Sequence, residues 1–270
     1  MAAVATVVAL LAGALPVSAE DSSLEAVGLT DDGRLVAFTI SQRLEVTEIG
    51  EVDGLKDDKR LVGIDYRVQD GKLYGVGDQG GIYTIDGKAN ATKVSQLTVD
   101  LDGDKFGVDF NPAADRLRII SDTGQNLRHN VNPNGTTIED GTLTYPGPPA
   151  TTAEGVTAAA YTNNDLDATT ATTLFDIDTK LDQVVIQSPA NAGLLAATGA
   201  LGVDADLWAG FDISSELDKG KTVANHGFAT LLVGKTYRLY RINLLTGQAT
   251  AIGDFPDKAH VVDLAIGLDS

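Results

Sequence analysis

A short signature recurs along the chain at intervals that few folds accommodate. It reads Gly63-Ile64-Asp65-Tyr66, Gly107-Val108-Asp109-Phe110 and Gly210-Phe211-Asp212-Ile213, with weaker forms at residues 158–161 and 261–264. Successive copies lie 44 to 52 residues apart, counted between Asp65, Asp109, Ala160, Asp212 and Asp263. Repeats of roughly 40–50 residues are typical of propeller blades, each of which is one small sheet. The spacing predicts about five copies of one strand-rich unit.

The two ends of the chain together supply the fifth copy. Few residues follow Asp263. Together, these residues and the segment between Glu20 and Asp65 are about as long as one repeat unit. We expect residues 261–267 to form the inner strand of this blade and residues 26–52 its outer strands. Pairing the terminal strands removes exposed sheet edges. The sequence therefore predicts an all-β, five-bladed β-propeller whose last blade is closed by strands from both termini.

Local patterns within the units agree with this fold. Apolar and polar residues alternate in segments such as 81–86, 171–178 and 237–243, as half-buried strands require. Turn formers separate these segments, for example Asp70-Gly71 and Asn134-Gly135. The 29 glycines and a hydrophobic content of 43% also favour many short strands around a sizeable core.

The first 19 residues read as a targeting segment. Val4 to Leu15 is almost wholly apolar, and Val17 and Ala19 fit the small-x-small pattern of signal cleavage sites. A membrane anchor is the alternative, but the run is shorter than the roughly 20 residues a span needs. We expect residues 1–19 to be a signal peptide and residues 20–270 a single β-propeller domain. The mature protein would be secreted, extracellular or associated with the cell surface, without membrane insertion.

Charge and cysteine content limit the partners and the chemistry. The formal net charge of −18 disfavours nucleic acid and anionic lipid, and suits cations, cationic partners or simple solubility. The chain has no cysteine, which excludes thiol nucleophiles, thiolate metal sites and disulfides. We expect a monomer that binds no nucleic acid.

The recurring aspartate is the main candidate for function. Asp65, Asp109, Asp212 and Asp263 occupy the same place in four of the five aligned units, and Ala160 stands in the fifth. On innermost strands, such carboxylates would border the central channel and could bind Ca²⁺ or another divalent cation. The alternative is that each carboxylate accepts backbone N–H groups from the neighbouring blade. Both interpretations remain open at this point.

Two further polar clusters are candidates. Asp100-Leu101-Asp102-Gly103-Asp104 resembles a calcium loop but departs from the EF-hand pattern, which needs glycine where Lys105 stands. A second cluster could grip an anionic or sugar-like ligand, or its arginines could instead pair with aspartates of adjacent blades. Its members are Arg116, Arg118, Asp122, Gln125, Asn126 and Arg128.

Motifs of hydrolases are absent: there is no G-x-S-x-G, no H-E-x-x-H and no glycine-rich phosphate loop. The leading hypothesis is therefore an exported binding module that presents a channel or face to a small ligand, glycan or protein. The alternative is a divalent-metal-dependent hydrolase or lactonase with the four aspartates at the central channel.

Several runs resemble one bacterial family of exported proteins, the domain of unknown function 4394 family. They are Leu61–Tyr66, Phe106–Pro112 with Asp115–Arg118, Ser121–Arg128 and Ala158–Asn163. The resemblance extends from about residue 26 to residue 268. It implies a propeller-like fold and export, and it lends no catalytic residues.

Overall fold

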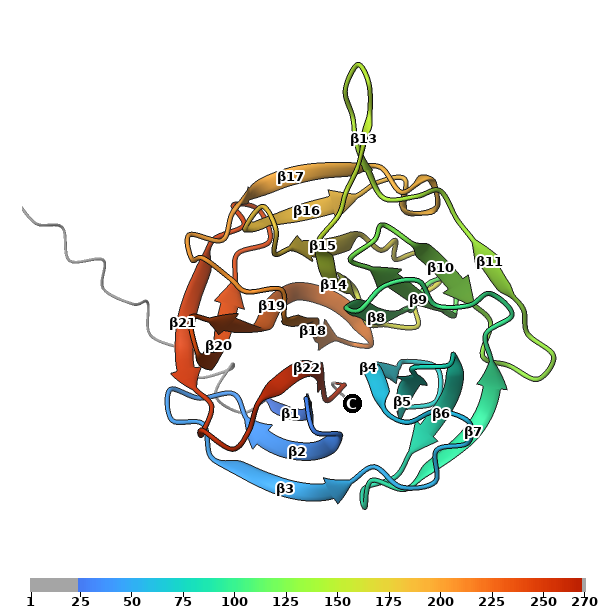
Figure 1. Ribbon diagram of the computed structural model, residues 1–270, viewed down its shortest axis with the longest axis vertical. Coiled ribbons are helices and arrows are strands. Elements are labelled where there is room, and N and C mark those ends of the chain that lie inside the picture. Colours follow the sequence, from blue (N-terminus) through green and yellow to red (C-terminus); the bar gives the residue numbers. More distant parts are fainter. Residues whose placement is uncertain (1–23, 269–270) are drawn as a thin grey trace, which may run out of the picture.

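Five four-stranded antiparallel sheets stand around a central axis as the blades of a propeller (Figure 1). The computed structural model describes residues 24–268, so the predicted signal peptide lies outside the described residues. Blades 1 to 5 are numbered from the blade that contains β1. Contacts between the inner strands of neighbouring blades run without a break around the ring, including between blades 5 and 1. The predicted all-β, five-bladed propeller is confirmed.

Each blade uses four strands in antiparallel order. Blade 1 contains β22 (Val261–Ile266), β1 (Glu25–Thr30), β2 (Arg34–Thr39) and β3 (Val46–Glu51). Blade 2 contains β4 (Leu61–Arg67), β5 (Lys72–Gly77), β6 (Gly81–Ile85) and β7 (Ala91–Gln96). Blade 3 contains β8 (Phe106–Asn111), β9 (Arg116–Ser121), β10 (Asn126–His129) and β11 (Thr137–Glu139).

Blades 4 and 5 follow the same plan. Blade 4 contains β14 (Val156–Tyr161), β15 (Leu174–Asp178), β16 (Gln183–Gln187) and β17 (Leu195–Ala200), with the short 3-10 helix η2 (Ala190–Ala192) before its last strand. Blade 5 contains β18 (Ala209–Asp218), β19 (Lys221–Val233), β20 (Thr236–Ile242) and β21 (Ala249–Asp254). Between blades 3 and 4, β12 (Thr144–Tyr145) and β13 (Thr151–Thr152) form a two-stranded hairpin that projects from the ring (Figure 1).

The chain closes its ring by pairing the first described strand with the last. β22 lies antiparallel to β1, with Ala26 opposite Ile266 and Gly28 opposite Leu264. β1 is thereby flanked on both sides, by β22 and β2, and it exposes no free edge. The predicted closure by both ends of the chain is confirmed.

Hydrophobic side chains fill the interfaces between blades. Because successive side chains of a strand point to opposite faces, Val108 and Phe110 pack with Tyr74 and Val76 between blades 2 and 3. Asp109, the residue between them, points the other way, toward blade 4. Similar buried clusters occupy the remaining interfaces. The alternation read from the sequence is therefore an alternation between two neighbouring blades.

Glycines allow the inner strands to approach one another closely. A Cβ atom on Gly107 would lie 2.6 Å from the backbone nitrogen of Ala159, and one on Gly210 would lie 2.4 Å from the Cα of Asp263. Neither glycine can be replaced without moving backbone atoms. These glycines open the signature because the inner strands are too close there for any side chain.

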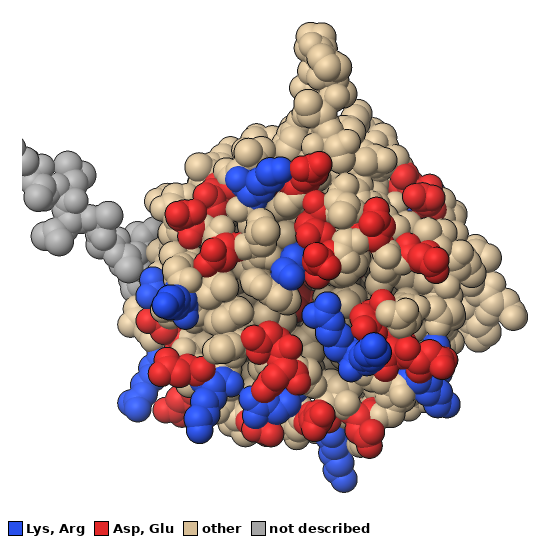
Figure 2. Space-filling model, in the orientation of Figure 1, with Lys and Arg blue, Asp and Glu red and all other residues tan. Residues whose placement is uncertain are grey.

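Charged side chains cover the face seen in Figure 2, where acidic and basic residues are intermixed rather than gathered in one patch. No helix within residues 24–268 is long and apolar enough to cross a membrane.

We predict that Gly107→Ala destabilises the propeller by about 1–3 kcal/mol, the usual cost of forcing extra volume into a packed site. Gly87→Ala is the matched control, because a Cβ atom there would meet nothing within 4 Å. Urea denaturation of both variants measures the difference. Equal midpoints for the two variants would contradict the close approach of the inner strands.

Candidate functional site

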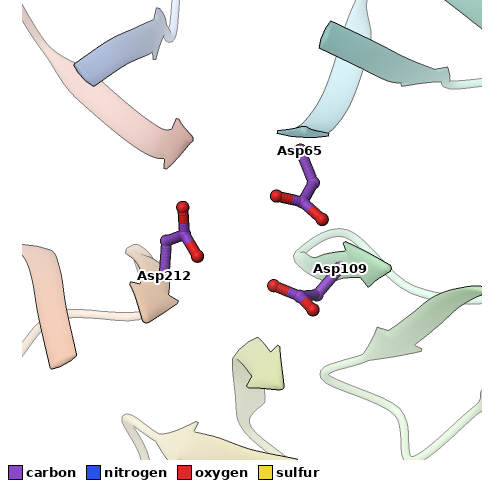
Figure 3. Close-up of side chains that lie close together, drawn as sticks. All are labelled: Asp65, Asp109 and Asp212. Atoms are coloured by element: carbon purple, nitrogen blue, oxygen red, sulfur yellow. The ribbon is translucent and has the colours of Figure 1, made fainter. Parts of the chain in front are cut away.

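Three aspartates from three different blades converge on the propeller axis. Asp65 lies on β4, Asp109 on β8 and Asp212 on β18. One carboxylate oxygen from each lies within 4.8 Å of the others. All three side chains are buried, and they point toward one another in the central space (Figure 3). We call these three residues the axial triad.

Each triad carboxylate is fixed by a backbone N–H of the next blade. The N–H of Phe110 donates to Asp65 Oδ2 at 2.7 Å, and the N–H of Tyr161 donates to Asp109 Oδ1 at 3.1 Å. The N–H of Ile266 donates to Asp212 Oδ2 at 2.6 Å. The two placements of the carboxylates that the sequence left open therefore occur together. The carboxylates face the axis and also connect neighbouring blades.

Asp263 occupies a different level of the axis. The triad contacts reach the residues that follow Asp109, Ala160 and Ala265, so the residue of β22 at the level of the triad is Ala265. Asp263 instead accepts the N–H of Ile64 at 2.8 Å. Its carboxylate lies beside Gly63, where a Cβ atom would be 3.2 Å from Oδ2.

The predicted equivalence of all four aspartates is therefore corrected: β22 is displaced by two residues relative to the other inner strands. A two-residue displacement keeps every side chain on its original face. The alternation of apolar and polar residues in the sequence is the same in either alignment, so it could not reveal the displacement.

Burial and mutual repulsion disfavour ionised carboxylates at the axis. Burial, followed by the charge of Asp212, raises the pKa of Asp65 well above its ordinary value. Burial and then the charges of Asp65 and Asp212 do the same to the pKa of Asp109. Burial raises the pKa of Asp212 to about 6, against the opposing effect of two backbone N–H bonds. Burial also raises the pKa of Asp263 well above its ordinary value.

No basic side chain within residues 24–268 is among the groups that shift the pKa values of the triad. A protein interior compensates such a group of carboxylates with protons or with a bound cation. The arrangement supplies oxygen donors only, which hard cations such as Ca²⁺ prefer.

The cluster around β9 and β10 is not one site. Arg118 is only 2% exposed, and it bonds Asn126, Asp140, Asn191 and the hydroxyl of Tyr161. Arg128 also bonds Asp140. These contacts form an internal network between blades 3 and 4. Arginine pairing was the alternative weighed for this cluster, but the partner is Asp140, not a signature aspartate.

The remaining members of the cluster have other partners. Asp122 Oδ1 accepts the N–H groups of Asp104 and Lys105. Gln125 accepts the N–H of Asp102 and donates to the carbonyl of Asp100. Both residues thus hold the acidic loop at 100–104 in place. Arg116 donates to the carbonyl oxygens of Ala114 and Asp115.

The acidic loop does not form a metal cage of its own. Within the described chain, the axial triad is the one group of three acidic or histidine side chains whose ligand atoms converge. The loop instead packs near the entrance of the channel, where Asp104 and Lys105 line a small pocket.

Sequence reasoning missed two features. Asp176 on β15 is fully buried, and neither of its carboxylate oxygens has a hydrogen-bond partner in the described chain. Burial raises its pKa well above the ordinary value. In the sequence it sits in an alternating strand pattern and carries no distinguishing mark. The second feature is the contact of Lys105 with Trp208, which lie about 100 residues apart and share no motif.

Comparison with known proteins gives fold-level likenesses and one family. No curated protein matches the chain. Auxiliary nutrient binding proteins from Bacteroides thetaiotaomicron and Bacteroides ovatus are 11% and 13% identical to it, each with a TM-score of 0.44. The matches cover 75% and 77% of this chain but only 55% and 56% of those proteins. A Bacteroides thetaiotaomicron protein of unknown function is 13% identical, with a TM-score of 0.47 and coverage of 95% and 69%.

All three TM-scores lie below 0.5, so these likenesses bear on neither ligand nor activity. The family match is of a different kind, because it rests on the sequence and spans most of the chain. The pattern of the family described as Domain of unknown function (DUF4394) matches residues 34–265, and the chain belongs to that family.

Proposed function

We propose that this protein is an exported binding module whose central channel takes a divalent cation on Asp65, Asp109 and Asp212. The observation that carries the proposal is the convergence of three buried carboxylates within 4.8 Å on the axis. Export is proposed from the sequence of residues 1–19 alone. We further propose that the mature protein acts as a monomer outside the cell or at its surface.

A cation would remove the electrostatic penalty at the axis. Burying one ionised carboxylate without a partner costs roughly several kcal/mol of folding free energy. Three ionised carboxylates that face one another cost more. The backbone donors of Phe110, Tyr161 and Ile266 offset part of this cost. Ca²⁺ commonly takes about six to eight oxygen ligands, so three carboxylates would leave coordination positions for water or for an atom of a bound molecule. Asp263, one level away, adds a fourth carboxylate to the same channel.

A binding role is favoured over hydrolysis by the residues at the axis. Within residues 24–268, the converging ligand atoms all belong to Asp65, Asp109 and Asp212, and no histidine joins them. The sequence also has no hydrolase motif that would add a nucleophile or a general base.

We predict that the purified protein binds about one Ca²⁺ per chain, and that Asp65→Asn and Asp212→Asn each weaken binding at least tenfold. Asparagine keeps an oxygen that can accept the backbone N–H, so the connection between blades is preserved while the charge is lost. Asp176→Asn is the matched control, because Asp176 is also buried but lies on β15 and is not one of the converging carboxylates. Isothermal titration calorimetry and native mass spectrometry measure both quantities.

Failure to bind Ca²⁺, Mg²⁺, Mn²⁺ or Zn²⁺ at millimolar concentration would refute the cation site. Lactone or ester hydrolysis by the metal-loaded protein, lost in Asp65→Asn, would instead favour the alternative of a metal-dependent hydrolase.

The raised pKa values of the triad should also make the stability of the folded protein depend on pH. A carboxyl group whose pKa is raised on folding keeps its proton in the native state after the unfolded chain has lost it, so stability falls as pH rises between the two pKa values. For Asp212 this window runs from 3.8 to about 6, and its cost at pH 8 is on the order of 3 kcal/mol. Burial raises the pKa values of Asp65 and Asp109 as well, so both carboxyl groups change the stability in the same direction.

We therefore predict that the melting temperature falls from pH 5 to pH 8 in chelator, and that millimolar CaCl₂ reduces the fall. The fall should be smaller in Asp212→Asn. Differential scanning calorimetry at both pH values provides the test, and a melting temperature that rises over this range would show that the axial carboxylates are already compensated.

A further inference from the structure

The entrance of the channel is built from the beginnings of all five inner strands. The pocket there is lined by Leu61, Phe106, Thr157, Ala209 and Val262, each at or next to the first residue of its strand. Lys105 and Trp208, which directly precede β8 and β18, complete its wall. Both side chains therefore border this end of the channel.

Lys105 lies on the face of the indole ring. Its ammonium nitrogen is 3.8 Å from the ring centroid of Trp208, the distance of a close cation–π contact. Both residues are half-buried. Lys105 takes part in none of the ion pairs formed within residues 24–268. The aromatic face is thus the partner that the structure gives to this ammonium group.

The backbones of Trp208 and Lys105 are both fixed, and the end of the lysine side chain contacts the ring alone. The backbone N–H of Trp208 donates to the carbonyl of Asp206, and the carbonyl of Trp208 accepts the N–H of Leu232 on β19. The backbone of Lys105 is fixed by Asp122, but its long side chain ends on the ring alone. The lysine side chain has a flexible four-carbon stem, so it can leave the ring without breaking these backbone contacts.

The charge at the entrance favours a cation as the replacement. Besides Lys105, the charged residues of the pocket wall are Asp31, Asp104 and Arg60. Once the ammonium of Lys105 has swung out, two carboxylates and one guanidinium remain in the pocket wall. An anionic ligand would meet this negative balance and the overall charge of −18.

We propose that the channel entrance binds the alkylammonium or trimethylammonium group of a small organic cation on the face of Trp208, and that the ligand displaces Lys105 to do so. With Lys105 in place, its ammonium group occupies the ring face that such a headgroup would use, so displacement is part of binding. Recognition of quaternary ammonium groups by aromatic faces is a general use of this interaction. The inference rests on the proposed role as a binding module, but not on the metal at the triad.

The single tryptophan of the chain makes the site directly observable. Choline is the probe, and 3,3-dimethylbutan-1-ol, which has nearly the same shape without the charge, is its control. We expect choline to change the fluorescence of Trp208 in a saturable way and the alcohol to have no such effect. Lys105→Ala should bind choline at least threefold more tightly, because the internal competitor is gone.

Lys72→Ala is the matched variant, since it removes one exposed lysine that is not part of the pocket. Its affinity for choline should equal that of the unmodified protein. Trp208→Leu, checked for folding by circular dichroism, should lose choline binding in calorimetry. Equal affinities of the Lys105 and Lys72 variants, or equal binding of choline and the alcohol, would overturn the proposal.

A last measurement separates this inference from the metal site. Choline binding to Asp65→Asn in chelator should match that of the unmodified protein, because the entrance does not require the cation at the triad. If Ca²⁺ binding fails while choline binding persists, the metal proposal alone is lost. If Ca²⁺ binds and choline does not, the entrance proposal alone is lost.

Discussion

The structure depends on hydrogen bonds from backbone N–H groups of one inner strand to a carboxylate on the inner strand before it. These bonds occur at the axis, where the inner strands of neighbouring blades meet. Each bond satisfies a buried donor and fixes the height of one blade against the next. The same geometry collects negative charge in a buried space. Cohesion of the ring and the capacity to attract a cation therefore have a common origin.

Much of the fold follows from the sequence. The spacing of the signature and the alternation of apolar and polar residues recur in every unit, so each copy supports the same interpretation. The count of five blades, the closure by β22 and β1, and the inner-strand position of the signature are all confirmed. The displacement of Asp263 by two residues was not predictable in this way. Either alignment presents the same apolar face to the neighbouring blade. The contacts of Ile64 with Asp263 and of Ile266 with Asp212 distinguish the two.

The candidate sites also differ in whether the sequence could predict them. Asp65, Asp109 and Asp212 share a strand position, so the repeat predicts that they lie at equivalent places around the axis. The structure adds that their carboxylates face it. For Arg118 and Arg128 the sequence left ligand binding and pairing with aspartates of adjacent blades open. Their common partner, Asp140, belongs to a region without any motif. Lys105 and Trp208 meet across two different inter-blade loops. Pairing of this kind depends on how loops of different blades converge at one end of the ring, which no repeat encodes.

The pairing of β22 with β1 also has a consequence for how the chain acquires its structure. The strands of blade 1 that are synthesised first receive their inner neighbour only from the last strand described, at residues 261–266. Contacts of such long sequence separation form slowly, since a large loop must close before they contribute. A chain interrupted before β22 would leave the edge of β1 open to pairing with another chain. Only a chain that includes β22 can therefore cover the edge of β1. A chain that ends earlier leaves this edge exposed.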